Sequence, residues 1–562
     1  MTVENSTLSN SHVKLLSKKF YQTLMNNIKL KLIVFVFLIL SVNCYSQQQQ
    51  EWVRQFNSGL NQNDNVTDMK IDDEGNIYLC GSVQFTSSIK DLLLLKYSSS
   101  GELLWSRTWR GTGVSLNDNV GKKILFDSKG FIYVMGTASI SATYLDFLVI
   151  KYNPNGDTVW IRTFDGMNDN VDDATDMVID KNDNVYLTGL LSRFGTSDNG
   201  TIKYDENGNL KWKKKFSDFS GRSILLDSGF LYVGGASNYD ISILKYDTIG
   251  NLIDTFYCGT ENSDGAQLMV FDSQKNLIVS GIENAGLPTQ YNIVTAKISQ
   301  TGVKSWISVF NNNFDNRPEY LYDLETDSAG NALILVRSRN QQYNRSEICL
   351  IKYDNKNGDS IWTRKYNLAP FSNEQPVKMT QDKDNNIYII ETSDSNVIFY
   401  RIVIIKYNSS GQLQWHKVYY PALFSNSYGA CISADTLGNI YAAGITNYDQ
   451  TGGDDIVLIK YSTMTNVSET STALPGKFEL YQNYPNPFNS QTEIKFDLIK
   501  SGHYKIEVFD MLGRSVAILF NEFKNAGSYN LNYDASNLSS GIYFYKLNSP
   551  ELNIIKKFIL VK

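Results

Sequence analysis

Asp91-Leu-Leu-Leu-Leu-Lys-Tyr-Ser-Ser-Ser-Gly-Glu-Leu-Leu-Trp105 is the stretch that decides the fold, because versions of it return along most of the chain. The returns lie at residues 146–160, 201–212, 241–254, 292–306, 347–362, 402–415 and, cut short, 455–461. Self-similarity at periods of 20 to 50 residues is typical of repeat architectures. The sequence therefore predicts one structural unit used many times.

Four marks recur in a fixed order, and each occurs eight times at intervals of 42 to 56 residues. The first is a strand ending in aspartate, at Asp72, Asp127, Asp180, Asp227, Asp272, Asp327, Asp382 and Asp435. The second is a strand such as 76–81 (NIYLCG), 131–136 (FIYVMG) or 439–444 (NIYAAG). The third ends in Lys-Tyr, at Lys96, Lys151, Lys203, Lys245, Lys352, Lys406 and Lys460, with Lys297-Ile298 as the variant. The fourth holds an aromatic residue, at Trp52, Trp105, Trp160, Trp212, Phe256, Trp306, Trp362 and Trp415.

The marks have the composition of short strands joined by tight turns. Runs such as 92–95 (LLLL) and 402–405 (IVII) are apolar on both faces, as in a strand buried between two layers, and are too short for helices. Asp-x-x-Gly-Asn at 72–76, 327–331 and 435–439 joins the first strand to the second, and its Gly or Asn tolerates positive φ. Lys275 breaks that preference, and the copy at 227–230 is one residue shorter.

These strands predict an all-β protein built around an eight-bladed β-propeller at residues 51–461, with four antiparallel strands in each blade. The first tryptophan strand, 51–56, precedes every other mark, while the last unit ends at Tyr461 without one. We therefore expect the N-terminal strand to complete the last blade and close the ring, since an open array would expose strand edges.

The repeat Asp-x-x-Gly-Asn-Ile-Tyr…Lys-Tyr…Gly-x-x-x-Trp resembles the bacterial β-propeller (SBBP-like) repeat family of secreted proteins along residues 51–461. The glycine and tryptophan spacing also resembles the tryptophan docking of eight-bladed quinoprotein propellers. It occurs at Gly101/Trp105, Gly156/Trp160, Gly208/Trp212, Gly302/Trp306, Gly358/Trp362 and Gly411/Trp415, whereas Gly250 is followed at that spacing by Asp254. The resemblance implies that each indole fills the gap between neighbouring blades.

The links between blades repeat Asn-Asp-Asn-Val and place Asp64, Asp118 and Asp169 on the face that also carries the variable loops. Loops on a rigid scaffold are where binding usually resides. The three carboxylates are candidate ligands of a hard cation or of a polyhydroxyl ligand. The favoured alternative is that Asn-Asp forms side-chain-to-backbone turns, because the three copies lie on adjacent blades and not around the axis.

Catalysis has little support in the sequence. No His is positioned with a Ser or Cys, no phosphate loop or metal-ligand motif occurs, and the Cys-Cys pair of quinoprotein enzymes is missing. We expect a non-catalytic binding or structural module without a cofactor, whose ligand is a glycan or a surface protein. The alternative is a secreted polysaccharide-acting hydrolase or lyase that uses acidic loop residues.

Net charge and cysteine positions limit which partners and which cysteine chemistry are expected. The net charge of −6, without a long basic run, makes nucleic acid a poor partner. Cys80, Cys349 and Cys431 fall in apolar strand patterns, so we expect buried free thiols and not disulfides.

The N-terminus reads as a signal peptide at residues 1–46. Lys29 and Lys31 precede nine apolar residues, 32–40, which reach only about 14 Å as a helix and cannot span a bilayer. Cleavage near Ser46 is expected, and Met25 begins a signal of ordinary proportions. A lipoprotein cysteine at Cys44 is the lesser alternative. We expect the mature chain to contain no transmembrane segment.

A Ser/Thr-rich linker at 462–475 precedes a different pattern at 476–562, where about seven short alternating strands predict a small Ig-like β-sandwich. The words 483–489 (NYPNPFN), 508–514 (VFDMLGR), 540–543 (SGIY) and 556–562 (KKFILVK) resemble the C-terminal sorting domain of the type IX (Por) secretion system of Bacteroidota. The resemblance implies export through the periplasm and recognition by the secretion machinery at the outer membrane. The residues carrying it are Pro485, Asn486, Pro487, Phe488, Gly513, Arg514, Gly541, Lys556 and Lys557.

Overall fold

The chain divides into two compact units, Met1–Met464 and Thr465–Lys562. The computed structural model describes residues 49–60, 62–86, 89–112, 117–140, 145–166, 171–193, 196–237, 240–284, 291–312, 318–340, 342–369, 371–394, 399–421, 425–447, 453–462, 477–499, 502–524, 527–536, 538–549 and 552–562. The expected signal peptide, Cys44, Asp169 and nearly all of the expected linker lie outside the described residues. None of the described residues forms a helix long and apolar enough to cross a membrane.

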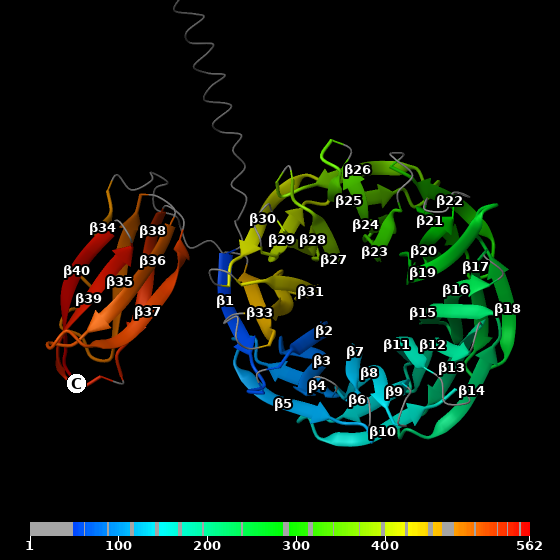
Figure 1. Ribbon diagram of the computed structural model, residues 1–562, viewed down its shortest axis with the longest axis horizontal. Helices are drawn as coiled ribbons and strands as arrows, with labels where there is room; N and C mark the ends of the chain where they lie inside the picture. Colours follow the sequence, from blue (N-terminus) through cyan, green and yellow to red (C-terminus); the bar gives the residue numbers. More distant parts are fainter. Residues whose placement is uncertain are drawn as a thin grey trace, which may run out of the picture. The chain divides into compact units, whose positions relative to one another are not determined.

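The first unit is a ring of eight antiparallel sheets, each of which is one blade (Figure 1). Blades 1 to 8 begin with the inner strands β2 (Asp64–Ile71), β7 (Val120–Phe126), β11 (Asp172–Ile179), β15 (Phe219–Asp227), β19 (Ser263–Phe271), β23 (Tyr320–Thr326), β27 (Glu374–Gln381) and β31 (Ser427–Ala434). Their second strands are β3 (Ile77–Thr86), β8 (Ile132–Ser139), β12 (Val185–Arg193), β16 (Phe230–Ser237), β20 (Leu277–Asn284), β24 (Ala332–Asn340), β28 (Ile387–Ser393) and β32 (Ile440–Thr446).

The third strands are β4 (Ile89–Tyr97), β9 (Leu145–Tyr152), β13 (Thr196–Tyr204), β17 (Asp240–Asp247), β21 (Tyr291–Ile298), β25 (Arg345–Tyr353), β29 (Arg401–Tyr407) and β33 (Asp455–Ser462). The outer strands are β5 (Leu103–Trp109), β10 (Thr158–Phe164), β14 (Leu210–Phe216), β18 (Leu252–Tyr257), β22 (Lys304–Phe310), β26 (Ser360–Tyr366), β30 (Leu413–Tyr419) and, in blade 8, β1 (Gln49–Phe56). A two-residue strand, β6 (Asn117–Asp118), pairs in parallel with β4.

The ring is closed by the N-terminal strand, as the sequence predicts. β1 pairs antiparallel with β33, and Trp52 lies opposite Lys460 in that ladder. The inner strands contact one another in the order β2, β7, β11, β15, β19, β23, β27, β31 and again β2. The predicted closure is therefore confirmed.

The hydrophobic core lies between neighbouring blades. One cluster, for example, joins Met69 and Leu93 of blade 1 to Tyr441 and Leu458 of blade 8. The thiols of Cys80, Cys258, Cys349 and Cys431 are buried and free, which confirms the expectation for three of them and adds the fourth. Lys275, which breaks the preference for Gly or Asn, adopts a φ of +64° and forms the same turn with Asp272.

The second unit is a two-sheet β-sandwich. One sheet contains β34 (Glu479–Leu480), β35 (Gln491–Leu498) and β38 (Gly527–Asp534), and the other contains β37 (Ser515–Lys524), β36 (Gly502–Phe509), β39 (Gly541–Ser549) and β40 (Leu552–Leu560). Side chains of both sheets share one core, including Phe496 of β35 and Tyr545 of β39. The Ig-like assignment stays a prediction compatible with this arrangement.

Candidate functional site

In blades 2, 5 and 6 the repeated aspartate and lysine form an ion pair, and the lysine also binds the next blade. In blade 2, the buried Lys151 Nζ lies 3.1 Å from Asp127 Oδ2 and 4.9 Å from the centre of the Tyr133 ring. The same ammonium donates a hydrogen bond to the backbone carbonyl of Glu206 in blade 3 at 3.1 Å. The same ion pair joins Lys297 to Asp272 and Lys352 to Asp327. These residues of the repeat therefore build the scaffold.

The repeated glycines and aromatic residues also join neighbouring blades. A Cβ atom on Gly208, whose φ is +77°, would lie 2.8 Å from Cδ2 of Trp160 in the preceding blade. The pairs that meet in this way are Gly101 with Trp52, Gly156 with Trp105, Gly208 with Trp160, Gly250 with Trp212, Gly302 with Phe256, Gly358 with Trp306 and Gly411 with Trp362. The predicted docking is thus confirmed at these positions, Phe256 included.

Sequence reasoning missed an arginine that completes this docking. Arg162 Nε donates to the Gly208 carbonyl at 2.5 Å, and its guanidinium lies over the Trp160 ring at 5.6 Å. Arg54, Arg107 and Arg364 make the same bond to the docking glycine of the next blade. The signal was the repeated Trp-x-Arg spacing.

The opposite face carries the links between blades and the second-to-third loops, because antiparallel connections alternate between the two ends of a sheet. Asp64 opens β2 and is buried, and its Oδ2 accepts a hydrogen bond from the Ser58 backbone N–H at 2.7 Å. Desolvation raises the pKa of Asp64 above its usual value. Asp118 lies in β6 and pairs with Lys90 at 3.0 Å.

Asp64 and Asp118 do not occupy equivalent positions, although both lie in the motif Asn-Asp-Asn-Val. The Asp64 amide donates to the Asp454 carbonyl, and the equivalent bond in blade 2 runs from the amide of Asn119 to Lys90. Blade 2 is therefore offset by one residue at this point. The structure brings neither residue into a shared acidic group, and Asp169 lies outside the described residues.

Acidic side chains at the start of the other inner strands hold the links in the same way. Asp264 accepts a hydrogen bond from the Thr260 backbone N–H, and Glu374 accepts one from the Leu368 backbone N–H at 2.8 Å. Most acids of this position are thus used by the backbone of their own link. This is the side-chain-to-backbone role that the sequence favoured over a cation site.

One acidic group has the donor set that a hard cation takes. Asp146, Asp165 and Asp172 each offer a carboxylate oxygen, and these oxygens lie within 4.8 Å of one another. Asp146 and Asp172 are buried, whereas Asp165 is exposed. The repeated sequence motifs did not single out these three residues, because the residues come from two blades and the link between them.

Blade 6 contains a buried polar network around two glutamates. Ser338 Oγ donates to Glu319 Oε1 at 3.1 Å, and Lys365 Nζ pairs with Glu347 Oε1 at 2.8 Å. Asn312 joins the two halves, since it donates to Ser338 Oγ at 2.7 Å and accepts from Lys365 at 2.8 Å. Burial raises the pKa of Glu319 to about 7. Only 6% of Glu319 and 2% of Glu347 is exposed, so both carboxylates are largely shielded from solvent.

Acidic side chains on the inner strands contact charged side chains or backbone N–H groups of other blades. Asp68 of β2 lies 4.0 Å from Lys378 of β27, and its other oxygen accepts the Ile124 backbone N–H at 2.9 Å. Burial raises the pKa of Asp323 on β23, which accepts the Met379 backbone N–H at 2.9 Å. These acids therefore join inner strands of different blades.

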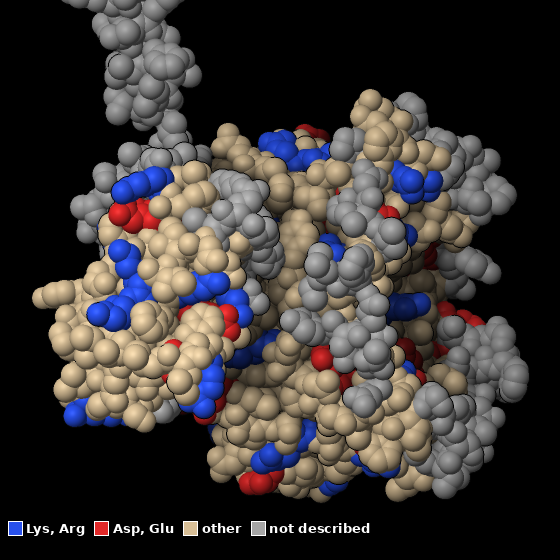
Figure 2. Space-filling model, turned by 60° about the vertical axis from the view of Figure 1, so that its left-hand side comes forward, with Lys and Arg blue, Asp and Glu red and all other residues tan. Residues whose placement is uncertain are grey.

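An open groove of about 240 Å³ lies between blades 4 and 5 on the loop face. Ser220 and Arg222 of β15 line one side, and Asp264 and Gln267 of β19 line the other. Tyr291 stands at its rim with 37% of its surface exposed. In the view of Figure 2, the coloured charges form small separate groups among uncharged residues.

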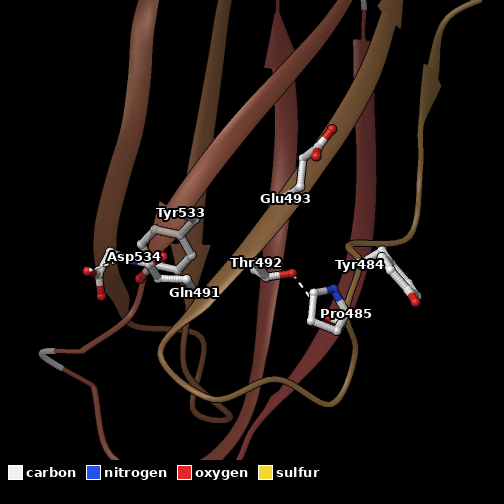
Figure 3. Close-up of a pocket in the computed structure, with 7 residues that line it drawn as sticks. All are labelled: Tyr484, Pro485, Gln491, Thr492, Glu493, Tyr533 and Asp534. Atoms are coloured by element: carbon white, nitrogen blue, oxygen red, sulfur yellow. Dashed lines mark hydrogen bonds between the residues drawn. The ribbon is translucent and has the colours of Figure 1, made fainter.

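The proline-rich segment 483–489 of the sandwich packs against the last strand, β40. Asn486 Oδ1 accepts the Ile559 backbone N–H at 2.9 Å, and Phe488 is buried with its ring 5.3 Å from that of Phe558. Pro485 and Pro487 both follow cis peptide bonds. Pro485 also accepts a hydrogen bond from Thr492 through its carbonyl, in a hollow of about 510 Å³ bordered by the exposed Tyr484 (Figure 3).

The other residues singled out in this domain lie in turns and on strands. Gly513 has a φ of +76° in a turn where Arg514 Nε donates to Asp510 Oδ2 at 2.7 Å. Gly541 opens β39. Lys557 is exposed on β40, while Lys556 is half-buried there. Whether the secretion machinery contacts these residues stays a prediction.

Comparison with protein families identifies the second unit. Residues 482–562 match the family described as the secretion system C-terminal sorting domain. This domain indicates export through the type IX secretion system to the cell surface or the medium. No curated protein matches the chain.

Among solved structures, the chain is similar to the β-propeller domain of the trilobed protease from Pyrococcus furiosus, at 11% identity and a TM-score of 0.35, over 64% of this chain and 99% of that one. It is similar to the polysaccharide lyase Uly1 at 10% identity and a TM-score of 0.39, over 75% and 94%. It is also similar to a prolyl endopeptidase at 11% identity and a TM-score of 0.40, over 69% and 55%. At such low identities and scores these similarities carry no information about substrate.

Proposed function

We propose that the propeller is a non-catalytic binding module that its sorting domain delivers to the cell surface or the medium. The observation that carries this proposal is that side chains on the loop face have two different roles. Acids such as Asp64 and Glu374 hold the links, whereas the groove between blades 4 and 5 presents side chains to the solvent. A rigid scaffold with an open polar hollow is suited to holding a ligand.

We also propose that the ring belongs with the SBBP-like repeat propellers of secreted proteins. The support is the role of the repeated marks, since aspartate, lysine, glycine and tryptophan all serve contacts between blades. A repeat whose fixed residues are structural leaves the variable loops to select the ligand, which on a cell surface is a glycan or another surface protein.

A binding screen of the full chain tests the proposal. Immobilised polysaccharides and outer-surface fractions should retain the protein saturably, and the recovered ligand should have unchanged mass. Release of shortened or unsaturated sugars would refute the non-catalytic assignment.

A polysaccharide-acting enzyme is the second candidate, and the network in blade 6 is the observation that favours it. A glutamate with a pKa near 7 beside an ion-paired glutamate has the chemistry of an acid and base pair. Glu319→Gln separates the two candidates, because it would abolish turnover in such an enzyme and leave ligand retention unchanged in a binding module.

A further inference from the structure

The junction of blades 4 and 5 contains a cation whose counter-charge is replaced by glycine. Each inner strand has a one-residue bulge, which is Lys122 in β7 and Arg222 in β15. Lys122 forms an ion pair with Asp173 of the next blade. Register against the second strand places Gly265 at the position that Asp173 occupies, so Arg222 faces a glycine.

Arg222 thus differs from the bulge residues of the first three blades. Thr67 and Thr175 donate hydrogen bonds to the carbonyls of Gly121 and Gly221 in the next blade, as Lys122 binds its acid. Arg222 is exposed, and no acid among the described residues forms an ion pair with it. A guanidinium held on a strand without a counter-charge favours an anionic ligand.

The missing side chain also creates the groove. Gly265, Ala266 and Ala236 line it and leave the space that larger residues would fill. Its volume of about 240 Å³ corresponds to about eight water molecules at ~30 Å³ each. This is the size of one small ring and not of a protein segment.

The remaining lining groups are those that bind hydroxyls and a ring. Ser220 and Gln267 offer a hydroxyl and an amide, and Tyr291 offers an aromatic ring at the rim. Asp264 is 4% exposed, and its Oδ1 has no hydrogen-bond partner among the described residues. Burial raises the pKa of Asp264 above its usual value, and a carboxylate oxygen is an acceptor for a hydroxyl group.

We infer that the groove between blades 4 and 5 binds a sugar ring that carries one anionic group, a carboxylate or a sulfate ester. Arg222 pairs with the anion, Asp264 and Gln267 bond the ring hydroxyls, and Tyr291 packs against the ring. This inference rests on the proposed binding function and names the ligand class of that function.

Titration of the full chain by NMR with glucuronic acid, glucose 6-sulfate and glucose tests the inference. The two anionic sugars should bind at least tenfold more tightly than glucose, and raised salt should weaken them. If only one anionic sugar binds, that result identifies the anionic group and supports the assignment. Equal affinity for glucose, or no binding of any of the three, would overturn it.

Three variants locate the site. Arg222→Gln should lower affinity for the anionic sugars at least tenfold without a change in folding, because the side chain is exposed. Gly265→Asp should do the same by giving Arg222 the acid that Asp173 gives Lys122; its Cβ would lie 3.3 Å from that of Ala236, a small adjustment. Lys122→Gln is the matched control and should bind like the wild type.

The outcomes separate this inference from the proposed binding function on which it rests. If Arg222→Gln and Gly265→Asp both retain wild-type affinity, the groove assignment is wrong while the binding function stands. If the sugars are chemically altered during the titration, the binding function itself is wrong.

Discussion

Alanine at a docking glycine should cost more stability than alanine at a glycine with the same backbone and free space. Gly208 and Gly130 both have a φ of +77°, so alanine at either position incurs the same left-handed strain, about 1–2 kcal/mol. At Gly130 nothing lies within 4 Å of an added Cβ, whereas at Gly208 it would lie 2.8 Å from Trp160 Cδ2. Overpacking of this kind costs a further ~1–3 kcal/mol.

Urea unfolding followed by tryptophan fluorescence measures this difference selectively. The chain has 8 Trp, all at or before residue 415, so the signal reports on the propeller and not on the sorting domain. Gly208→Ala should lower the free energy of unfolding by about 1–3 kcal/mol more than Gly130→Ala. Equal losses would refute the role of the indole as a spacer between blades.

Three further predictions concern acids and the sorting domain. Glu319 has a pKa raised to about 7, so the folded protein keeps a proton that the unfolded chain loses near pH 4.5, and the free energy of unfolding should fall as pH rises from 4.5 to 7. In chemical denaturation, Glu319→Gln should therefore be about 2 kcal/mol more stable than the wild type at pH 8 and almost equal to it at pH 4. An equal effect at both pH values would count against this. Phe488 is buried, so Phe488→Ala should destabilise the sorting domain by ~3–5 kcal/mol in a thermal melt. Arg514 is exposed, so Arg514→Ala should leave the domain folded and reduce export in a secretion assay. Normal export of Arg514→Ala would show that Arg514 is not part of the signal. Millimolar calcium should shift the unfolding midpoint of Asp64→Asn and of the wild type equally, because Asp64 serves the backbone; a shift lost in the variant would restore the cation hypothesis.

The ring could be predicted because each mark is local and repeated. Trp52 before the first repeat and Tyr461 at the end of the last one were enough to predict the β1–β33 ladder. Glycine and tryptophan spacing predicted the docking for the same reason, since the contact recurs in nearly every blade.

The site could not be predicted in the same way, because it depends on what differs between blades. The match of Asp64 with Asp118 failed to give equivalent positions, since blade 2 is offset by one residue and Asn119 takes the place of Asp64. The pairing of Arg222 with Gly265 joins residues of two blades and becomes visible only when the bulges and ladders fix the register.

Mass analysis of an acidic oligosaccharide after prolonged incubation with a stoichiometric amount of the full chain tests the central claim, that the exported propeller holds its ligand without transforming it. The account predicts a retained oligosaccharide of unchanged mass that elutes when salt is raised. Shortened chains or products with a new double bond would contradict it.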